Sequence, residues 1–394
     1  MEIERLSLRH YRNYTRLDLP FGSGATLLYG PNAAGKTSIL EAIALLALSK
    51  SPRTSVDREL IGWQTSHSEL LPATARVSGD IRRQDRVTRL DVIIQARSDS
   101  PNQGASGGSA TKVLRVDGKP VRAGDLIGFA RMVFFAPTDL DIITGAPVER
   151  RRWIDAMLSQ LDSNYLRTLN LYQKVITQRN SLLRLWREKG ATPRNYATEL
   201  AFWDEQLAQA GAYIMLQRRA ALTELSASAA QTYAAISDQR TALEARYAAN
   251  MTQPWDNQSD AHEVLLAAYK KSHTEDMARM QTTVGPHRDD VLVHDRGVDL
   301  GTFGSRGQQR STVLALKMAE VAVMHARSGE RPILLLDDVL SELDALRRLH
   351  ILALISEPTQ QSILTATGVG DFSADFLASA QVLRVDQGHV SDMR

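Results

Sequence analysis

One stretch of eight residues has the side chains and the spacing to hold the phosphates of a nucleotide. It reads Gly-Pro-Asn-Ala-Ala-Gly-Lys-Thr and fits the pattern G-x-x-x-x-G-K-[ST]. The glycines let backbone N–H groups close around phosphate oxygens, at the positive end of the helix that follows. Lys36 is expected to reach the β- and γ-phosphates, and the Thr37 hydroxyl to bind Mg²⁺. The predicted nucleotide-binding residues are Gly30, Pro31, Asn32, Ala33, Ala34, Gly35, Lys36 and Thr37.

The segments beside this loop are those that a phosphate-binding loop needs. Residues 25–29 form a short apolar run that indicates a buried strand, and residues 38–46 indicate a helix. The alternative is a chance match in an ordinary glycine-rich turn. Because strand, glycine loop and helix occur in this order, we favour nucleotide binding.

Two carboxylates follow a second buried strand, which is predicted over residues 333–336. In P-loop ATPases the first such carboxylate, here Asp337, binds Mg²⁺ together with the loop hydroxyl. The second, Asp338, would lie beside the γ-phosphate and polarise the attacking water, so Asp338 and Lys36 form the predicted catalytic pair. The alternative is an ordinary strand end, which would be the better interpretation without the upstream loop.

A third motif precedes the carboxylate strand. Residues 304–308 read Gly-Ser-Arg-Gly-Gln and resemble the signature loop of ABC-type ATPases, where a serine and N–H groups at a helix start bind a γ-phosphate. The alternative is a serine that only caps the helix. In ABC heads two copies pack head to tail, and the signature of one contacts the nucleotide of the other. The resemblance therefore implies that three residues act in trans: Ser305, Gly307 and Gln308.

Two further features support the ABC resemblance. Residues 341–344 have the spacing of a D-loop after the carboxylates, with Ser341 and Asp344 as its functional positions. Thr367 ends a predicted strand over residues 362–367, where these ATPases place a switch residue, usually histidine. The order of motifs resembles an ABC/SMC head, which implies ATP, Mg²⁺ and an ATP-dependent homodimer.

The composition sets limits on the class of protein. The chain has 394 residues and a net charge of +2. It contains no cysteine, which excludes disulfides, thiolate metal sites and cysteine nucleophiles. Any nucleic-acid binding must come from local basic patches. The N-terminus lacks the pattern of a signal peptide, and no apolar run reaches the roughly 18 residues of a membrane span. We expect a cytoplasmic protein without a membrane partner.

The predicted fold is α/β: a P-loop NTPase of ABC/SMC-head type with a β-rich lobe, an inserted helical lobe and no long coiled coil. Antiparallel strands are predicted over residues 73–96, and a hairpin over 113–121. Apolar spacing from residue 154 to 176 predicts one long helix, and alanine-rich helix is expected to continue to about Tyr247. Alternating strands and helices near the C-terminus imply a parallel sheet, with residues 382–385 as its last strand, that shares its core with the N-terminal segment. The predicted domains are residues 1–146 (first part of the head), 147–276 (helical lobe) and 277–394 (second part of the head).

Within the ABC/SMC class, the chain resembles the RecF family of bacterial recombination mediators over nearly its whole length. The matching pieces are residues 12–14, 30–37, 135–140, 147–155, 285–290, 304–310 and 337–344. The resemblance implies a weak, DNA-dependent ATPase that dimerises with ATP and binds double-stranded DNA or single-strand/double-strand junctions. It also implies work with RecR and RecO to place RecA on DNA during repair, replication and the SOS response.

The chain departs from the ABC pattern in two places. Asp338 stands where most ABC proteins have glutamate, and its shorter side chain suits slow hydrolysis that acts as a timer. No clear Q-loop glutamine is present. Two alternatives are a transport ATPase, which is disfavoured because no membrane-coupling segment is evident, and the ATPase subunit of a DNA-processing nuclease complex.

DNA contacts are predicted from two groups of arginines. One is Arg9 and Arg12, with Arg5 and Arg16 beside them; the other is Arg150 and Arg151, next to Arg152. Arginines that neutralise phosphates would make binding salt-dependent and largely independent of sequence. The alternative for both groups is solvated surface charge or internal ion pairs.

Overall fold

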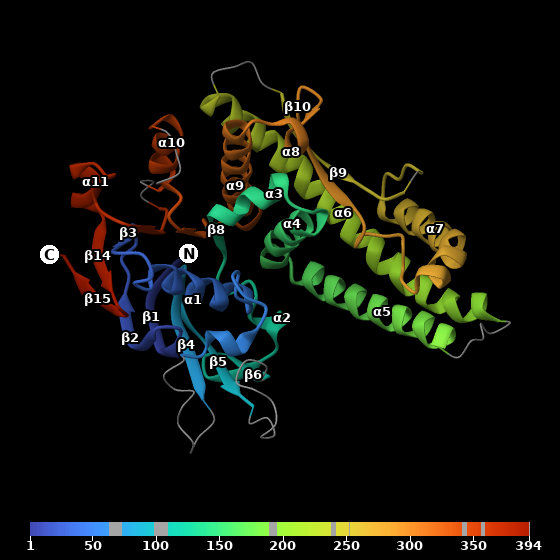
Figure 1. The fold of residues 1–394 in the computed structure, drawn as a ribbon, viewed down its shortest axis with the longest axis horizontal. Helices are drawn as coiled ribbons and strands as arrows, with labels where there is room; N and C mark the ends of the chain where they lie inside the picture. Colours follow the sequence, from blue (N-terminus) through green and yellow to red (C-terminus); the bar gives the residue numbers. More distant parts are fainter. Residues whose placement is uncertain are drawn as a thin grey trace. The chain divides into compact units, whose positions relative to one another are not determined.

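The computed structural model describes eight stretches of the chain (Figure 1): residues 1–62, 73–97, 109–188, 195–237, 242–251, 253–340, 345–355 and 359–393. Its contacts divide the chain into two compact units, which are residues 1–139 with 324–394, and residues 140–323. Residues 277–323 therefore group with the helical unit. The three-part division at residues 146/147 and 276/277 remains a prediction. Among the described residues, no helix is long and apolar enough to cross a membrane.

The first unit contains a six-stranded sheet built from both ends of the chain. β3 (Ala25–Tyr29) lies between β13 (Ser362–Ala366) and β14 (Gln381–Asp386) and is parallel to both. This confirms the predicted parallel sheet and its shared core. The expectation that residues 382–385 form the last strand was wrong, because an antiparallel strand follows it. The remaining strands are β12 (Ile333–Leu336), β8 (Met132–Phe135) and β15 (His389–Asp392), in the order β15-β14-β3-β13-β12-β8.

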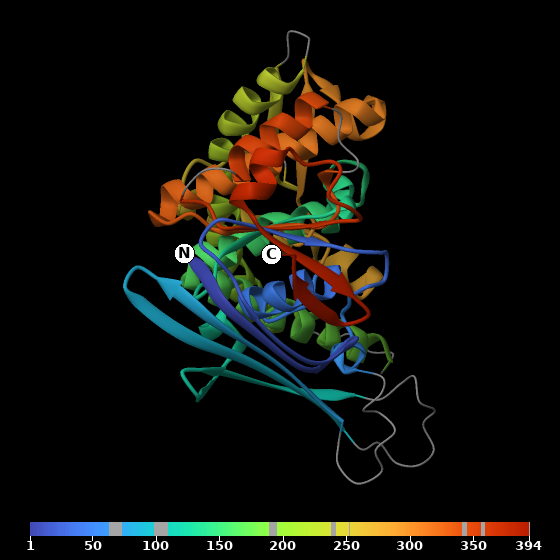
Figure 2. The ribbon, with the colours of Figure 1, turned by 90° about the vertical axis from the view of Figure 1, so that its left-hand side faces the viewer.

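A second six-stranded sheet in this unit is antiparallel, as the alternating sequence predicts. Its inner face carries buried residues such as Leu6, Leu8 and Val77, and the outer face of β1 and β4 is polar. Figure 2 shows the twist of these strands, coloured blue to cyan. They are β1 (Glu2–Tyr11), β2 (Tyr14–Pro20), β4 (Thr74–Arg83), β5 (Arg86–Ala96), β6 (Ala110–Val116) and β7 (Lys119–Val121), in the order β2-β1-β4-β5-β6-β7.

Helix α1 (Lys36–Leu48) follows the glycine loop and is packed on nearly every side. It contacts β4 and β5 of the antiparallel sheet and β13 and β8 of the parallel sheet. Eleven of its 13 residues are buried, as expected for a helix that is apolar all round. The position of α1 therefore depends on both sheets. The other helical segments of this unit are Asp57–Leu60, Ala123–Leu126, α10 (Ala345–Ile355) and α11 (Ala374–Ser379).

The second unit is mainly helical. The structure has two helices in place of the predicted long helix. The break lies at Asp162, whose backbone is extended and whose N–H donates to the carbonyl of Leu158 at the end of the first helix. The expectation of helix to about Tyr247 was also wrong. The helix ends at Ile236, and residues 243–248 form a strand that pairs with the strand after residue 289. The elements are α3 (Asp141–Thr144), α4 (Pro147–Leu161), α5 (Ser163–Glu188), α6 (Tyr196–Ile236), β9 (Leu243–Ala248), α7 (Gln258–Arg279), β10 (Asp290–Asp295), β11 (Val298–Asp299) and α8 (Leu300–Phe303).

Residues 285–290 join the helices of this unit to β10. Gly285 has a φ of +115°, and a Cβ atom there would collide with the Tyr269 hydroxyl. The carbonyl of Pro286 accepts a hydrogen bond of 2.6 Å from Arg218, which also pairs with Asp155 at 2.9 Å. Burial lowers the pKa of His287 to about 4, so its imidazole is neutral at pH 7. This motif therefore has a structural role in the helical unit.

Candidate nucleotide site

The glycine loop ends β3 and begins α1, as the sequence predicts. A Cβ atom at Gly30 would collide with the carbonyl oxygen of Val385 on β14. Gly35 has a φ of +115°, and a Cβ atom there would lie 2.5 Å from the Asn13 amide nitrogen. Side chains are therefore excluded at both glycine positions by neighbouring parts of the fold.

Two residues that the sequence did not assign to the site hold this loop. The Asn13 side-chain amide donates to the carbonyl of Ala34 at 3.0 Å, and the Tyr14 hydroxyl donates to the carbonyl of Gly35 at 3.1 Å. The N–H of Gly388 also donates to Ala34, at 3.1 Å. The β1–β2 hairpin and the β14–β15 turn thus fix the loop from two sides. In the sequence, the triplet of residues 12–14 stands out only through the family resemblance, because its contacts are with residues distant in the chain.

Lys36 is a buried cation without a paired carboxylate among the described residues. Its side chain donates to the carbonyls of Gly30 at 2.7 Å and Pro31 at 2.8 Å, and the residue is 8% exposed. Burial lowers its pKa, against the attraction of Asp338 and Asp337. The N–H groups of Gly35, Lys36 and Thr37 donate to none of the described residues. An uncompensated ammonium beside free N–H groups fits a phosphate.

The predicted metal ligands meet at one carboxylate. The Thr37 hydroxyl donates to Asp337 Oδ1 at 2.8 Å, and the Thr365 hydroxyl donates to the same oxygen at 2.9 Å. Thr365 also accepts from the N–H of Asp338 at 2.9 Å. Oxygen donors of this kind suit Mg²⁺, and the pairing of Thr37 with Asp337 fits the two residues predicted to hold it.

Two threonines lie near the end of β13, and the sequence predicts Thr367, rather than Thr365, as a site residue. Thr367 lies beyond the last residue of β13 and is exposed. Thr365, on the strand itself, makes the contacts with Asp337 and with the backbone of Asp338. The switch role of Thr367 remains a prediction. Asp338 has a φ of +52°, an uncommon conformation for aspartate that directs the chain after β12. Of the predicted D-loop, both Ser341 and Asp344 lie outside the described residues.

The signature segment lies in the second unit, at the start of α9 (Arg306–Ser328). The N–H of Ser305 donates to Gln308 Oε1 at 2.8 Å, and the N–H of Gln308 donates to Ser305 Oγ at 3.2 Å. This reciprocal pair is a capping box. Ser305 and Gln308 are exposed and Gly307 is half-buried, so capping leaves the serine accessible. Capping and binding a phosphate in trans are compatible, and the second role remains a prediction.

Four of the arginines predicted to contact DNA (9, 12, 150 and 151) have partners within the chain. Arg12 forms a two-pronged pair with Glu41 of α1, with distances of 2.9 and 2.7 Å, and Glu41 is completely buried. Arg9 pairs with Asp18 at 2.9 Å. Arg150 pairs with Asp290 at 2.7 Å, and Arg151 donates to the carbonyl of Asp289 at 2.6 Å. Their contact with DNA remains a prediction.

Fold and site together define a class of protein. A glycine loop between β3 and α1 faces a carboxylate after β12 of the same parallel sheet, which is the arrangement of a P-loop ATPase. Solved SMC heads share the fold: that of Pyrococcus furiosus, bound to the C-terminal domain of ScpA, matches 99% of this chain and 95% of its own at a TM-score of 0.51 and 15% identity. The fold is therefore that of ABC/SMC-type heads.

Sequence comparison narrows the class. The family model described as the RecF/RecN/SMC N-terminal domain matches residues 2–386. The "DNA replication and repair protein RecF" of Chloroflexus aurantiacus is 50% identical over 391 residues, 99% of each chain, and that of Heliobacterium modesticaldum is 36% identical over 392 residues, again 99% of each. A solved structure of the recombination mediator RecF with ATP, in the RecFOR pathway, covers 100% of this chain and 97% of its own at a TM-score of 0.85 and 31% identity. The chain belongs to the RecF family, and these matches favour it over the nuclease-subunit alternative.

The Arg12–Glu41 pair leads to a prediction about the site. Replacement of Arg12 by alanine leaves the buried Glu41 without its main partner and should lower the free energy of unfolding by about 3 kcal/mol. ATP affinity should fall with it, because α1 carries Lys36 and Thr37. Arg12→Lys keeps the charge but loses the two-pronged geometry, so it should be intermediate. Urea unfolding and ATP titration measure both effects.

The matched control is Arg16→Ala, since the Arg16 side chain is 74% exposed and makes only a 3.4 Å contact with Asp18. If Arg12→Ala unfolds at the wild-type urea concentration, the pair does not hold α1, and a surface role for Arg12 is the better interpretation.

Proposed function

We propose that the chain is an ATP-dependent DNA-binding protein of recombinational repair and replication. In this proposal ATP drives two copies into a dimer that binds double-stranded DNA or gapped junctions. With RecO and RecR the dimer helps to load RecA, and slow, DNA-stimulated ATP hydrolysis releases the dimer. We place this activity in the cytoplasm. The observation that carries the proposal is the buried Lys36 ammonium, which pairs with no carboxylate among the described residues, beside the Thr37–Asp337 contact in a chain 50% identical to a RecF protein.

ATP and Mg²⁺ would supply the charge that this site lacks. Lys36 would exchange the carbonyls of Gly30 and Pro31 for phosphate oxygens, and the free N–H groups of the loop would donate to them. Thr37 and Asp337 would hold the metal. The Thr365 hydroxyl hydrogen-bonds both to the Asp337 carboxylate and to the backbone N–H of Asp338. It therefore fixes the backbone position from which the Asp338 side chain extends.

The proposed dimer follows from the chemistry of the signature segment. Ser305 is exposed at the N-terminus of the 23-residue helix α9, where a hydroxyl and a helix dipole favour an anion. In a two-fold dimer, the same surface of each copy serves the other. ATP would then be part of the dimer interface. Asp338 would be the general base for ATP hydrolysis, and hydrolysis would let the dimer separate.

Asp338 can be tested by a substitution that keeps its size. Asp338→Asn removes the carboxylate that would polarise water, so turnover should fall by about 10²-fold or more. ATP should bind with wild-type affinity, since Lys36 and Thr37 are untouched. Phosphate release and nucleotide titration measure the two quantities. A steady-state rate equal to that of the wild type would refute the catalytic role.

Ser305 can be tested through assembly. Ser305→Arg places a bulky cation at the proposed interface, so it should prevent ATP-induced dimerisation and leave ATP binding by the monomer intact. Loss of the helix cap costs about 1 kcal/mol, which should not unfold the unit. Sedimentation velocity with and without ATP gives the mass.

The control is Ser181→Arg, the same change at an exposed position in α5. An ATP-induced dimer of Ser305→Arg that matches the control would rule out a signature acting in trans.

A further inference from the structure

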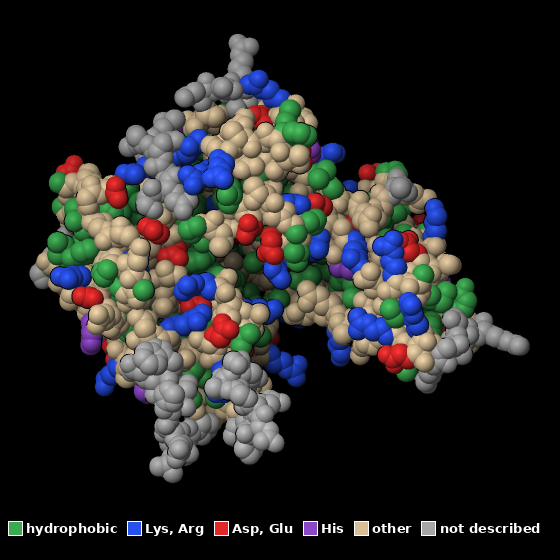
Figure 3. Space-filling view, viewed as in Figure 1, with side chains coloured by type: hydrophobic (Ala, Val, Ile, Leu, Met, Phe, Trp, Pro, Cys, Tyr) green, Lys and Arg blue, Asp and Glu red, His purple; other side chains and the backbone are tan. Residues whose placement is uncertain are grey.

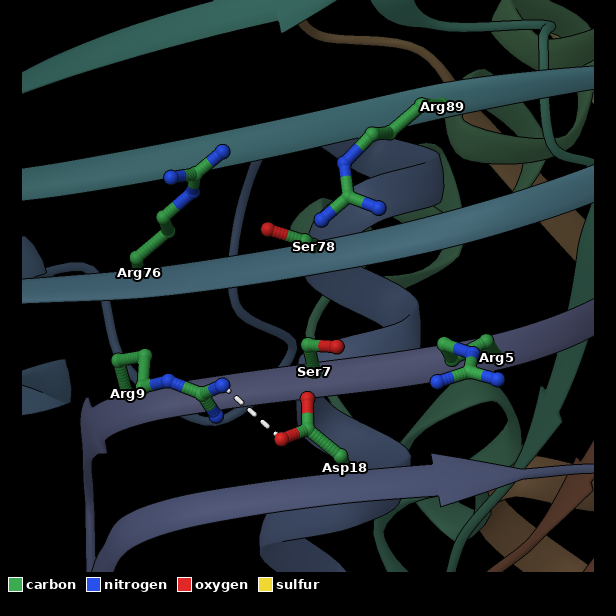
Figure 4. A pocket seen from close by; sticks show the side chains of 7 residues that line it. All are labelled: Arg5, Ser7, Arg9, Asp18, Arg76, Ser78 and Arg89. Carbon is green, nitrogen blue, oxygen red and sulfur yellow. Dashed lines mark hydrogen bonds and ion pairs between the residues drawn. The ribbon is translucent and has the colours of Figure 1, made fainter.

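A cavity lies on the outer face of the antiparallel sheet, away from the nucleotide loop. Its volume is about 280 Å³. The structure shows four arginines in its lining, contributed by three neighbouring strands, around two serines (Figure 4). We call this cavity the arginine basin; its lining residues are Arg5, Ser7, Arg9, Asp18, Arg76, Ser78 and Arg89.

We propose that the arginine basin binds successive backbone phosphates of nucleic acid. This inference rests on the proposed function and deepens it, because it names the surface of the first unit that meets DNA.

Strand register places like charges directly opposite one another beside the basin. Arg9 on β1 faces Arg16 on β2 and Arg76 on β4. Directly opposed residues of antiparallel strands share one face, and like charges in such pairs are destabilising. Three arginines in one row therefore cost stability, which an anionic ligand would recover.

Carboxylates beneath the basin hold the guanidinium groups in place. Asp91 is 2% exposed and accepts from Arg76 at 2.9 Å and from the Ser78 hydroxyl at 2.5 Å. Asp18 accepts from Arg9 at 2.9 Å. Both carboxylates lie in the central row of the sheet, between the rows of arginines. Guanidinium groups that are already ordered lose little entropy when they bind.

Donors remain for a ligand after these contacts are made. The side chain of Arg5 forms no hydrogen bond or ion pair with any residue that the structure describes, and it is exposed. The side chains of Arg76 and Arg89 are 44% and 45% exposed, although each pairs with an aspartate. Each guanidinium has five N–H donors in a plane, which suits phosphate oxygens.

The charge around the basin is positive although the chain as a whole is nearly neutral. Lysine, arginine, aspartate and glutamate intermingle on the face drawn in Figure 3, so a basic site must be local. Register places Arg115 opposite Asp91 on the same face as the basin. Six arginines (5, 9, 16, 76, 89 and 115) stand against four aspartates (18, 80, 91 and 117), a surplus of two positive charges.

Size and polarity favour nucleic acid over a single small anion or a protein. Arg5 and Arg9 are four residues apart on one strand, about 13 Å, and two strand spacings add about 10 Å across. Phosphates of one DNA strand recur about every 3.4 Å along the helix axis, so several can lie within this span. No lining residue is apolar, whereas the centre of a protein–protein interface is depleted of charge.

The test is the salt dependence of DNA binding by the full chain with ATP. Arg5→Ala should make the slope of log K against log salt shallower by about one, and Arg5→Ala/Arg89→Ala by about two, on any duplex sequence. The Arg5 side chain has no partner among the described residues, so the single variant should keep the melting temperature and ATP affinity of the wild type. Arg86→Ala is the control, since Arg86 lies outside the basin, pairs with Asp117 at 3.2 Å and is 76% exposed; its slope should match the wild type.

The outcomes separate this inference from the proposed function. If the wild type binds DNA with ATP and both basin variants keep its slope, the basin is not the contact surface and the proposed function stands. If the wild type binds no DNA with ATP, the proposed function and this inference both fail.

Discussion

The hydrogen bond between Thr37 and Asp337 joins two residues 300 positions apart in the chain. It exists because β3, from the N-terminal part, lies between β13 and β14, from the C-terminal part, with β12 beside β13. Parallel strands end at the same edge of their sheet, so the glycine loop after β3 and the carboxylates after β12 meet there. The nucleotide site is thus a consequence of how the two chain ends pair.

The antiparallel sheet contacts the nucleotide site through its β1–β2 hairpin. Asn13 and Tyr14 bind the carbonyls of the loop, and Arg12 binds Glu41 in α1. The inner face of the sheet also packs against that helix. The outer face of β1 carries Arg5 and Arg9 of the arginine basin. The antiparallel sheet therefore packs against the helix of the nucleotide loop on one face and carries the proposed phosphate surface on the other.

Features that depend on local sequence were predicted well. The loop, α1, the carboxylate strand and the Asp-Gly hairpin are read from periodicity and turn residues within short windows. Features that depend on distant partners were not. The sequence points to Thr367, and only the packing of β12 beside β13 shows that the Thr365 hydroxyl reaches Asp337. β9 was taken for helix because its alanine-rich sequence favours helix, whereas pairing with β10 decides its conformation. The partners of Arg12 and Arg150, too, come from other segments of the chain.

We propose that ATP, held by Lys36 and the Thr37–Asp337 pair, closes two copies of the chain on each other. Light scattering on the Asp338→Asn chain, which should retain its nucleotide, tests this with and without ATP and Mg²⁺. We expect the mass of one chain without ATP and twice that mass with it. A mass that does not change at saturating ATP would show that the bound nucleotide does not hold a dimer together.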